Sequence, residues 1–258
     1  MKNYFLKSND IQRGESISNP NVTSRSFLCG VVFILAINTV LSPVIARAES
    51  MPAVQTNNAS NTYEQRMSLF QQAVSNDLVG QHAEARKIYD ALKNSDISAN
   101  IAVPSAVNLV ALDRFSEARR AFNALAKSAN TRDRDYARLW QLWLTARRGT
   151  ANPQQLEKSL RAMAGGLQAT ASYQQEIINL YAGKSSVDAV FAAVSAMPDA
   201  SELQRTDALT EATFFTSGYL RYVKHDSPAA KDLLQKKSHQ LSSVSLELPL
   251  ITREKAAL

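Results

Sequence analysis

Three histidines are the side chains that could most directly serve acid–base or metal chemistry, and their spacing supports neither. His82, His225 and His239 lie far apart, and none belongs to an H-E-x-x-H pair or another known ligand spacing. The sequence also has no G-x-S-x-G motif and no phosphate-binding glycine loop. We therefore expect no metal site, no cofactor and no catalytic centre built on these residues.

Paired carboxylates could do a second kind of chemistry, because glycoside hydrolysis needs two of them held across a cleft. Glu176 and Glu211 are the best candidates for a general acid, since each falls in a partly apolar stretch. No sequence spacing pairs them, and an exposed helical position explains each more simply. A hydrolase that uses Glu176 or Glu211 as its acid is kept as an alternative hypothesis.

A basic stretch from Asp113 to Arg148 offers binding chemistry, with nine lysines and arginines against four acids. In a helix that begins near Asp133, its arginines would share one face and its tryptophans another. Arginine beside tryptophan is typical anchor chemistry for a peptide or an acidic group. The predicted partner-binding residues are Arg134, Arg138, Trp140, Gln141, Trp143 and Arg147. The alternative is that both tryptophans belong to the core and the arginines to a solvated face.

The elements expected to position these residues are helices throughout. From residue 62 onward Ala, Leu, Gln, Glu, Lys and Arg dominate, and no stretch alternates with period two. Glycine, proline and capping residues divide the chain into about nine to eleven helices joined as hairpins. The expected ranges are about 62–79, 82–94, 102–112, 115–128, 133–148, 153–164, 171–182, 186–197, 204–223, 228–238 and 245–256.

Two of these hairpins contain matching stretches, GQHAEARKIYDAL from Gly80 to Leu92 and DRFSEARRAFNAL from Asp113 to Leu125. They are set 33 residues apart and are identical at five of thirteen positions. A period in this range is typical of stacked helix hairpins, in which each unit buries its apolar face against its neighbours. Such stacks generally provide a binding surface.

Small residues recur twelve positions apart where two helices of such a unit would cross, and a large residue follows one turn later. The small pairs are Ala73 with Ala85, Ala106 with Ala118, and Gly218 with Ala230, and the large residues are Tyr89, Phe122 and Leu234. At these positions the sequence resembles the tetratricopeptide repeat family, whose unit has 34 residues. The resemblance covers three units and leaves residues 133–200 between them without the pattern.

The resemblance implies an α-solenoid of stacked hairpins whose first helices bind a peptide or protein without a cofactor. A helical bundle is the alternative, because alanine-rich helices share similar windows by chance.

The beginning of the chain predicts export. Arg25 precedes a mainly apolar stretch from Phe27 to Ala46, and Ala46-Arg47-Ala48 provides an A-x-A cleavage sequence. Residues 1–48 therefore predict a secretory signal peptide with an unusually long start, cleaved after Ala48. An uncleaved membrane anchor is the alternative, because about twenty apolar residues can span a bilayer.

Residues 49–61 are polar and predict a disordered tether ahead of a helical domain at 62–258. Cys29 is the only cysteine and lies in the predicted signal peptide, so the mature chain would have no disulfide. The net charge of +6 falls to about +3 without residues 1–48, which argues against nucleic acid as a partner.

The resulting hypothesis is a periplasmic, non-enzymatic scaffold or adaptor that binds a peptide or another envelope protein. The alternatives are a peptidoglycan-active hydrolase and a scaffold tethered to the membrane by an uncleaved first segment.

Overall fold

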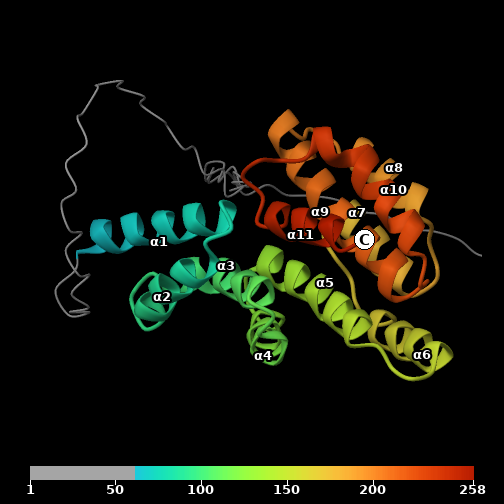
Figure 1. The fold of residues 1–258 in the computed structure, drawn as a ribbon, viewed down its shortest axis with the longest axis horizontal. Coiled ribbons are helices and arrows are strands. Elements are labelled where there is room, and N and C mark those ends of the chain that lie inside the picture. Colours follow the sequence, from blue (N-terminus) through green and yellow to red (C-terminus); the bar gives the residue numbers. More distant parts are fainter. Residues whose placement is uncertain (1–61) are drawn as a thin grey trace, which may run out of the picture. The chain divides into compact units, whose positions relative to one another are not determined.

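A computed structural model gives the structure of residues 62–258, so the predicted signal peptide (1–48), the tether (49–61) and Cys29 lie outside the described residues. Residues 62–258 form eleven α-helices, one short 3-10 helix and no strand (Figure 1). For these residues the prediction of an all-α fold with helical-repeat order is confirmed. The helices are α1 (Tyr63–Leu78), α2 (His82–Leu92), α3 (Ser98–Ala111), α4 (Phe115–Leu125), α5 (Thr131–Arg148), α6 (Pro153–Ala164), α7 (Ser172–Tyr181), α8 (Val187–Ser195), α9 (Glu202–Tyr222), α10 (Ser227–Lys237), η1 (Ser238–Gln240) and α11 (Leu248–Ala256).

The first ten helices pair in chain order into five hairpins, α1 with α2 through to α9 with α10. The turn of each hairpin contains one residue with a positive φ, a conformation that ends a helix and allows the chain to reverse. These residues are Gly80 (82°), Asp113 (56°), Gly149 (63°), Gly183 (69°) and His225 (54°). The hairpin order therefore continues through residues 133–200, where the sequence pattern of small residues is absent.

Four of the five turns also share the same backbone hydrogen bond, in which an amide reaches back five residues to a carbonyl of the preceding helix. This bond satisfies a carbonyl that the end of the helix would otherwise leave without a partner. The bonds are Gln81 N to Asn76 O (2.7 Å), Arg114 N to Leu109 O (2.8 Å), Lys184 N to Asn179 O (2.8 Å) and Lys224 N to Tyr219 O (3.1 Å). The first two lie at the start of the matching stretches, where the turns have the same backbone bond although Gly80-Gln81 and Asp113-Arg114 differ in residue type.

All the residues predicted to pack the repeats are buried, and the alanines among them have no exposed surface. They are Ala73, Ala85, Tyr89, Ala106, Ala118, Phe122, Gly218, Ala230 and Leu234. Gly218 differs from the prediction in what it faces. A Cβ atom placed there would lie 2.4 Å from Nε1 of Trp143 in α5, and the next residue it would meet is Tyr181 in α7. The close approach at Gly218 is thus to α5 rather than to Ala230 of its own hairpin.

A buried polar network joins the first hairpin to the second. Asn108 in α3 donates through Nδ2 to Oδ1 of Asp77 at 2.7 Å and to the carbonyl oxygen of His82 at 2.8 Å. Nδ1 of His82 lies 2.9 Å from the same Asp77 oxygen. His82 is therefore a structural residue that is tied to Asp77 at the hairpin turn.

Helix α9 is the centre of the second half of the structure. It packs against α5, α7, α8, α10 and α11, and its residues from Ala212 to Tyr219 are all buried. Thr210 and Thr213 donate their hydroxyl hydrogens to carbonyls one turn back, which allows polar side chains in a buried helix. Contact of α9 with α5 as well as α7 departs from a stack in which each hairpin touches only its neighbours.

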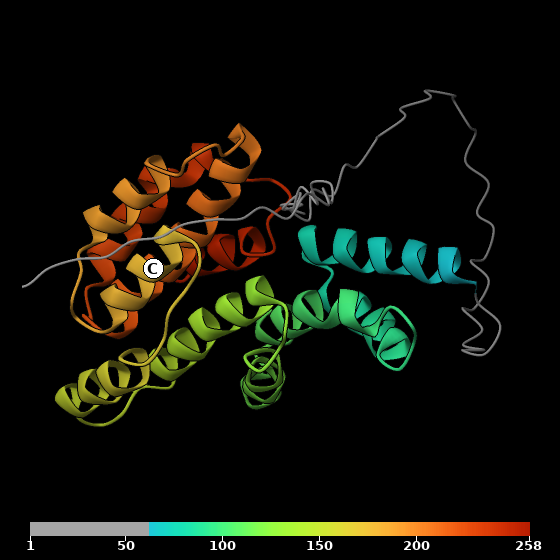
Figure 2. The ribbon, with the colours of Figure 1, turned by 180° about the vertical axis from the view of Figure 1, so that it is seen from behind.

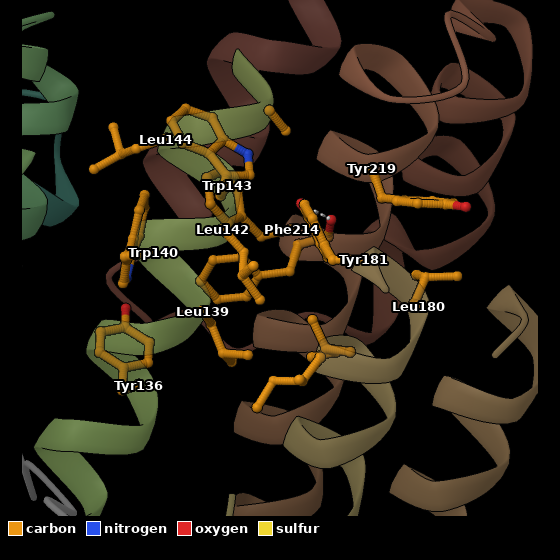
Figure 3. Packing of buried hydrophobic residues seen from close by; sticks show 14 of the residues in the cluster. Tyr136, Leu139, Trp140, Leu142, Trp143, Leu144, Leu180, Tyr181, Phe214 and Tyr219 are labelled. Carbon is orange, nitrogen blue, oxygen red and sulfur yellow. Dashed lines mark hydrogen bonds between the residues drawn. The ribbon is translucent and has the colours of Figure 1, made fainter. Parts of the chain in front are cut away.

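Aromatic side chains fill the space between α5 and α9 (Figure 3). The rings of Trp140 and Trp143 meet edge to face with centroids 5.5 Å apart, and Phe214 lies within 5.2 Å of both ring centroids. On its other side Trp140 stacks on Phe122 of α4 at 5.1 Å. This cluster connects the second hairpin with the fifth.

Candidate functional site

The two tryptophans predicted to bind a partner are core residues. Trp140 and Trp143 are 0% and 1% exposed, so neither ring can reach a partner while the protein is folded. This part of the predicted binding surface is wrong, and the alternative assignment to the core describes both residues. The reason is that α9 covers the face of α5 that the sequence leaves apolar.

Arg134, Arg138 and Gln141 lie on the outer part of α5 and are engaged within the chain. Arg138 binds Oδ1 of the buried Asp135 at 3.1 Å and the carbonyl oxygen of Gln168 at 2.8 Å, and Arg134 lies 3.6 Å from the same Asp135 oxygen. Gln141 donates to Asn123 of α4 at 2.9 Å. These side chains hold neighbouring elements together, and each is only partly exposed.

Arg147, the last predicted residue, belongs to a different arrangement. Its guanidinium lies over the ring of Phe115 at 4.5 Å and is hydrogen-bonded to the hydroxyl oxygen of Tyr222. It also lies 3.3 Å from a carboxylate oxygen of Glu254 in α11. Arg147 therefore connects α5 to a segment more than a hundred residues further along the chain.

We call residues 241–258 the 241–258 segment; it comprises seven residues without regular structure, α11 and the two residues after it. It packs against α9, α10 and α1, and the reverse view in Figure 2 shows α11 beside α9 and close to α5. The residues that contact it through polar groups form the segment-binding surface. They are Val110, Ala111, Asp113, Tyr136, Arg147, Thr210, Arg221 and Tyr222.

Glu254 is the most heavily bonded side chain of the segment. Its carboxylate is paired with Arg147 and Arg221, and Tyr222 donates its hydroxyl hydrogen to it at 2.9–3.0 Å. The residue is 7% exposed, so the carboxylate has exchanged water for two guanidinium groups and a hydroxyl. A buried carboxylate is stable only when it is paired in this way.

The neighbouring Arg253 reaches in the opposite direction. It donates to the carbonyl oxygen of Ala111 at 2.6 Å and to that of Val110 at 3.4 Å, and it lies 3.5 Å from Asp113. These carbonyls belong to the last turn of α3, which carries partial negative charge, and that of Val110 also accepts a hydrogen bond from the Asp113 amide at 3.0 Å. A guanidinium group is well suited to this position because it offers several donors in one plane.

Apolar contacts also bind the segment to the rest of the structure. Leu250 and Ile251 are 2% and 3% exposed and belong to the hydrophobic core of the second half. Further back, the amide of Ser242 donates to the hydroxyl oxygen of Thr210 at 2.8 Å. Side chains, rather than a continuous ladder of backbone bonds, thus recognise the segment.

A pair of acids lies where the first part of the segment meets α5, α7 and α9. Glu247 of the segment accepts hydrogen bonds from Tyr136 and Ser245. Glu211 of α9 accepts from Nε2 of Gln174 at 2.7 Å and from the hydroxyl of Tyr173 at 3.3 Å. Burial and the Glu247 carboxylate raise the pKa of Glu211 to about 8, and burial also raises the pKa of Glu247.

We expect Glu211→Gln to be more stable than the unchanged chain at pH 8, by on the order of 2 kcal/mol. The pKa of Glu211 is about 8 in the folded chain and 4.5 in the unfolded chain. Between these two pH values the folded chain keeps a proton on Glu211 that the unfolded chain has released. The stability contributed by this proton is lost as the pH rises from 4.5 towards 8. Glutamine cannot titrate and keeps an acceptor oxygen for Gln174 and Tyr173.

Urea unfolding at pH 5 and pH 8 measures this difference. Glu84→Gln is the matched control, because Glu84 is an exposed acid of α2. If the stability of Glu211→Gln falls with pH as steeply as that of the unchanged chain, Glu211 is not the buried acid that causes the fall.

The other acid considered for hydrolysis, Glu176, lies on α7 and accepts hydrogen bonds from Ser185 and from Asn179 at 3.2 Å. The structure does not bring it to Glu211, which has the side chains of Tyr173 and Gln174 as partners. Among residues 62–258 no group of three or more His, Asp or Glu side chains could hold a metal ion.

Sequence reasoning missed the residues of the segment and, apart from Arg147, the surface that holds it. Tyr222, Arg221, Arg253 and Glu254 were not singled out, although a last helix over about residues 245–256 was expected. The one sequence signal is that Leu250 and Ile251 stand next to Arg253 and Glu254. Nothing in the spacing connects that group with Arg147.

None of the helices in the described part of the chain is both long and apolar enough to span a membrane. Comparison of the chain with protein-family models, with curated proteins and with solved structures gives no match.

Proposed function

We propose that this protein is an exported, non-enzymatic scaffold that binds a helical peptide segment of another envelope protein. The observation that carries the proposal is that Arg147, Arg221 and Tyr222 all bind the carboxylate of Glu254. This surface holds α11 of the same chain through charge, hydrogen bonds and apolar contacts, which supports the binding of a partner's helix in the same way. The repeat resemblance supports the same function, because it implies peptide binding by the first helices of stacked hairpins.

Export is proposed from the sequence of residues 1–48, with cleavage after Ala48. The mass of the chain recovered from cells tests this part, because cleavage leaves residues 49–258. Recovery of the full mass in a membrane fraction would instead identify a scaffold tethered by its first segment.

Photocrosslinking in living cells tests the binding function. A crosslinking residue in place of Arg114, which is exposed beside Asp113 of the segment-binding surface, is expected to capture a reproducible envelope protein. The same residue in place of Glu84, exposed on α2, is the control and should give much less of that adduct. Equal capture at both positions, or no reproducible adduct at either, would contradict the proposal.

One observation favours the alternative of a wall-active hydrolase. With a pKa of about 8, Glu211 carries a proton at neutral pH, as a general acid must. Against this, two cavities among residues 62–258, of about 380 and 190 Å³, are lined by other residues. Incubation of the purified protein with peptidoglycan distinguishes the two functions: release of fragments that Glu211→Gln abolishes would establish the enzyme.

A further inference from the structure

We infer that the 241–258 segment is a displaceable ligand held in cis. In its place, the segment-binding surface accepts a partner's helical peptide that presents two adjacent apolar residues, then an arginine and a carboxylate. This inference rests on the proposed binding function and specifies the chemistry of the partner and the regulation of the site.

The arrangement of the chain separates the segment from the five hairpins. Residues 241–247, which have no regular structure, connect it to η1, and α11 pairs with no following helix among the described residues. Each of the ten preceding helices has a hairpin partner other than α11. The segment can therefore leave the surface without opening a hairpin.

Charge complementarity defines what can replace it. Two arginines and a tyrosine hydroxyl converge on the single carboxylate of Glu254, which fits an aspartate or glutamate of a peptide. The carbonyl end of α3 and Asp113 take one guanidinium group, which fits an arginine at the preceding position. The buried Leu250 and Ile251 set the two apolar positions one turn earlier.

The empty surface would be costly, which favours exchange over simple release. Without the segment, Arg147 and Arg221 would lose their shared carboxylate, and the apolar contacts of Leu250 and Ile251 would face water. A second peptide with the same groups restores both. The segment thus occupies the surface until a peptide with the same charged and apolar groups replaces it.

One side chain of the segment, Glu247, weakens the binding of the segment to the surface. Glu247 is placed next to the acidic Glu211, with Tyr136, Tyr173, Gln174, Asp207 and Arg132 as the other polar groups that face this pair. A partner peptide without an acid at the corresponding position avoids the cost of burying the carboxyl group of Glu247. Such a peptide has an advantage over the segment in competition for the same surface.

The test uses the full chain and a fluorescein-labelled peptide with the sequence of residues 241–258. In Glu254→Lys the lysine is repelled by Arg147 and Arg221, so the cis segment no longer competes with the peptide. We expect fluorescence anisotropy to give a Kd for this variant that is at least ~10-fold lower than for the unchanged chain. Lys255→Glu is the matched control, because Lys255 is exposed on the same helix and should leave the Kd unchanged.

Two peptide variants complete the test. The labelled peptide with Glu254→Lys should bind none of the chains, and the peptide with Glu247→Gln should bind more tightly than the original. Circular dichroism first establishes that Glu254→Lys is folded; where it is not, Glu254→Gln replaces it, because the amide keeps the size of the side chain. If neither variant folds, the segment is a permanent part of the core and the inference is overturned.

Equal binding of the peptide to the folded variant and to the unchanged chain would also overturn it. So would a dimer of the unchanged chain with exchanged segments, since a second copy would then be the occupant. If the peptide fails while crosslinking in cells still captures a partner, the scaffold function stands and only its proposed ligand chemistry is lost.

Discussion

Trp140→Ala is expected to lower the free energy of unfolding by about 4 kcal/mol, the largest loss for any single change considered. Trp140 has no exposed surface and lies at the centre of the aromatic cluster, in ring contact with Phe122, Trp143 and Phe214. Alanine would leave a cavity between helices of different hairpins, which the surrounding rings can fill only in part. Urea unfolding followed by circular dichroism measures the loss.

Tyr63→Ala is the control for removing an aromatic ring, because Tyr63 is 55% exposed at the start of α1. Its expected effect is within about 0.5 kcal/mol. A loss of less than about 1.5 kcal/mol for Trp140→Ala would contradict the close packing of α5 against α9.

Gly218→Ala has the second largest expected effect, a loss of about 2–3 kcal/mol. The new Cβ atom would lie 2.4 Å from Nε1 and 2.5 Å from Cδ1 of Trp143. The indole ring cannot move aside easily, because it is 1% exposed and stacks on Phe214 with centroids 5.2 Å apart. Alanine favours a helix over glycine by about 1 kcal/mol, and the clash outweighs this gain.

Gly166→Ala provides the matched control, since a Cβ atom there would meet nothing within 4 Å. Its stability should stay close to that of the unchanged chain. Thermal unfolding of both variants under the same conditions compares them, and an alanine at position 218 that stabilises the protein would show that α5 and α9 are not in close contact.

The sequence predicted most of the fold because the relevant signals are local. Gly80 and Asp113, set 33 residues apart, both take a positive φ at a hairpin turn. Gly149 was also recognised as the end of a helix, but the small residues of the repeat do not recur near it. In the structure Gly149 and Gly183 also take a positive φ at hairpin turns. The hairpins therefore continue into the part of the chain where the sequence pattern of small residues is absent.

The site was less predictable because its contacts join distant parts of the chain. Arg147 and Glu254 are 107 residues apart in sequence, and no periodicity relates them. The tryptophans illustrate the opposite error. An apolar stripe on α5 predicts a buried face or a binding face equally well, and only the position of α9 decides for the core.

The place of α9 at the centre of the second half has a consequence for the order of folding during synthesis. Trp143 of α5 stacks on Phe214, which is synthesised about 70 residues later. At a translation rate of roughly 5–20 residues per second, this is an interval of several seconds. Throughout that interval the side of α5 that packs against α9 has no native cover, although Trp140 can already stack on Phe122 of α4. The nascent chain therefore leaves the α9-facing side of Trp143 uncovered until its last hairpin is made, and α5 reaches its native packing only after α9 has been synthesised.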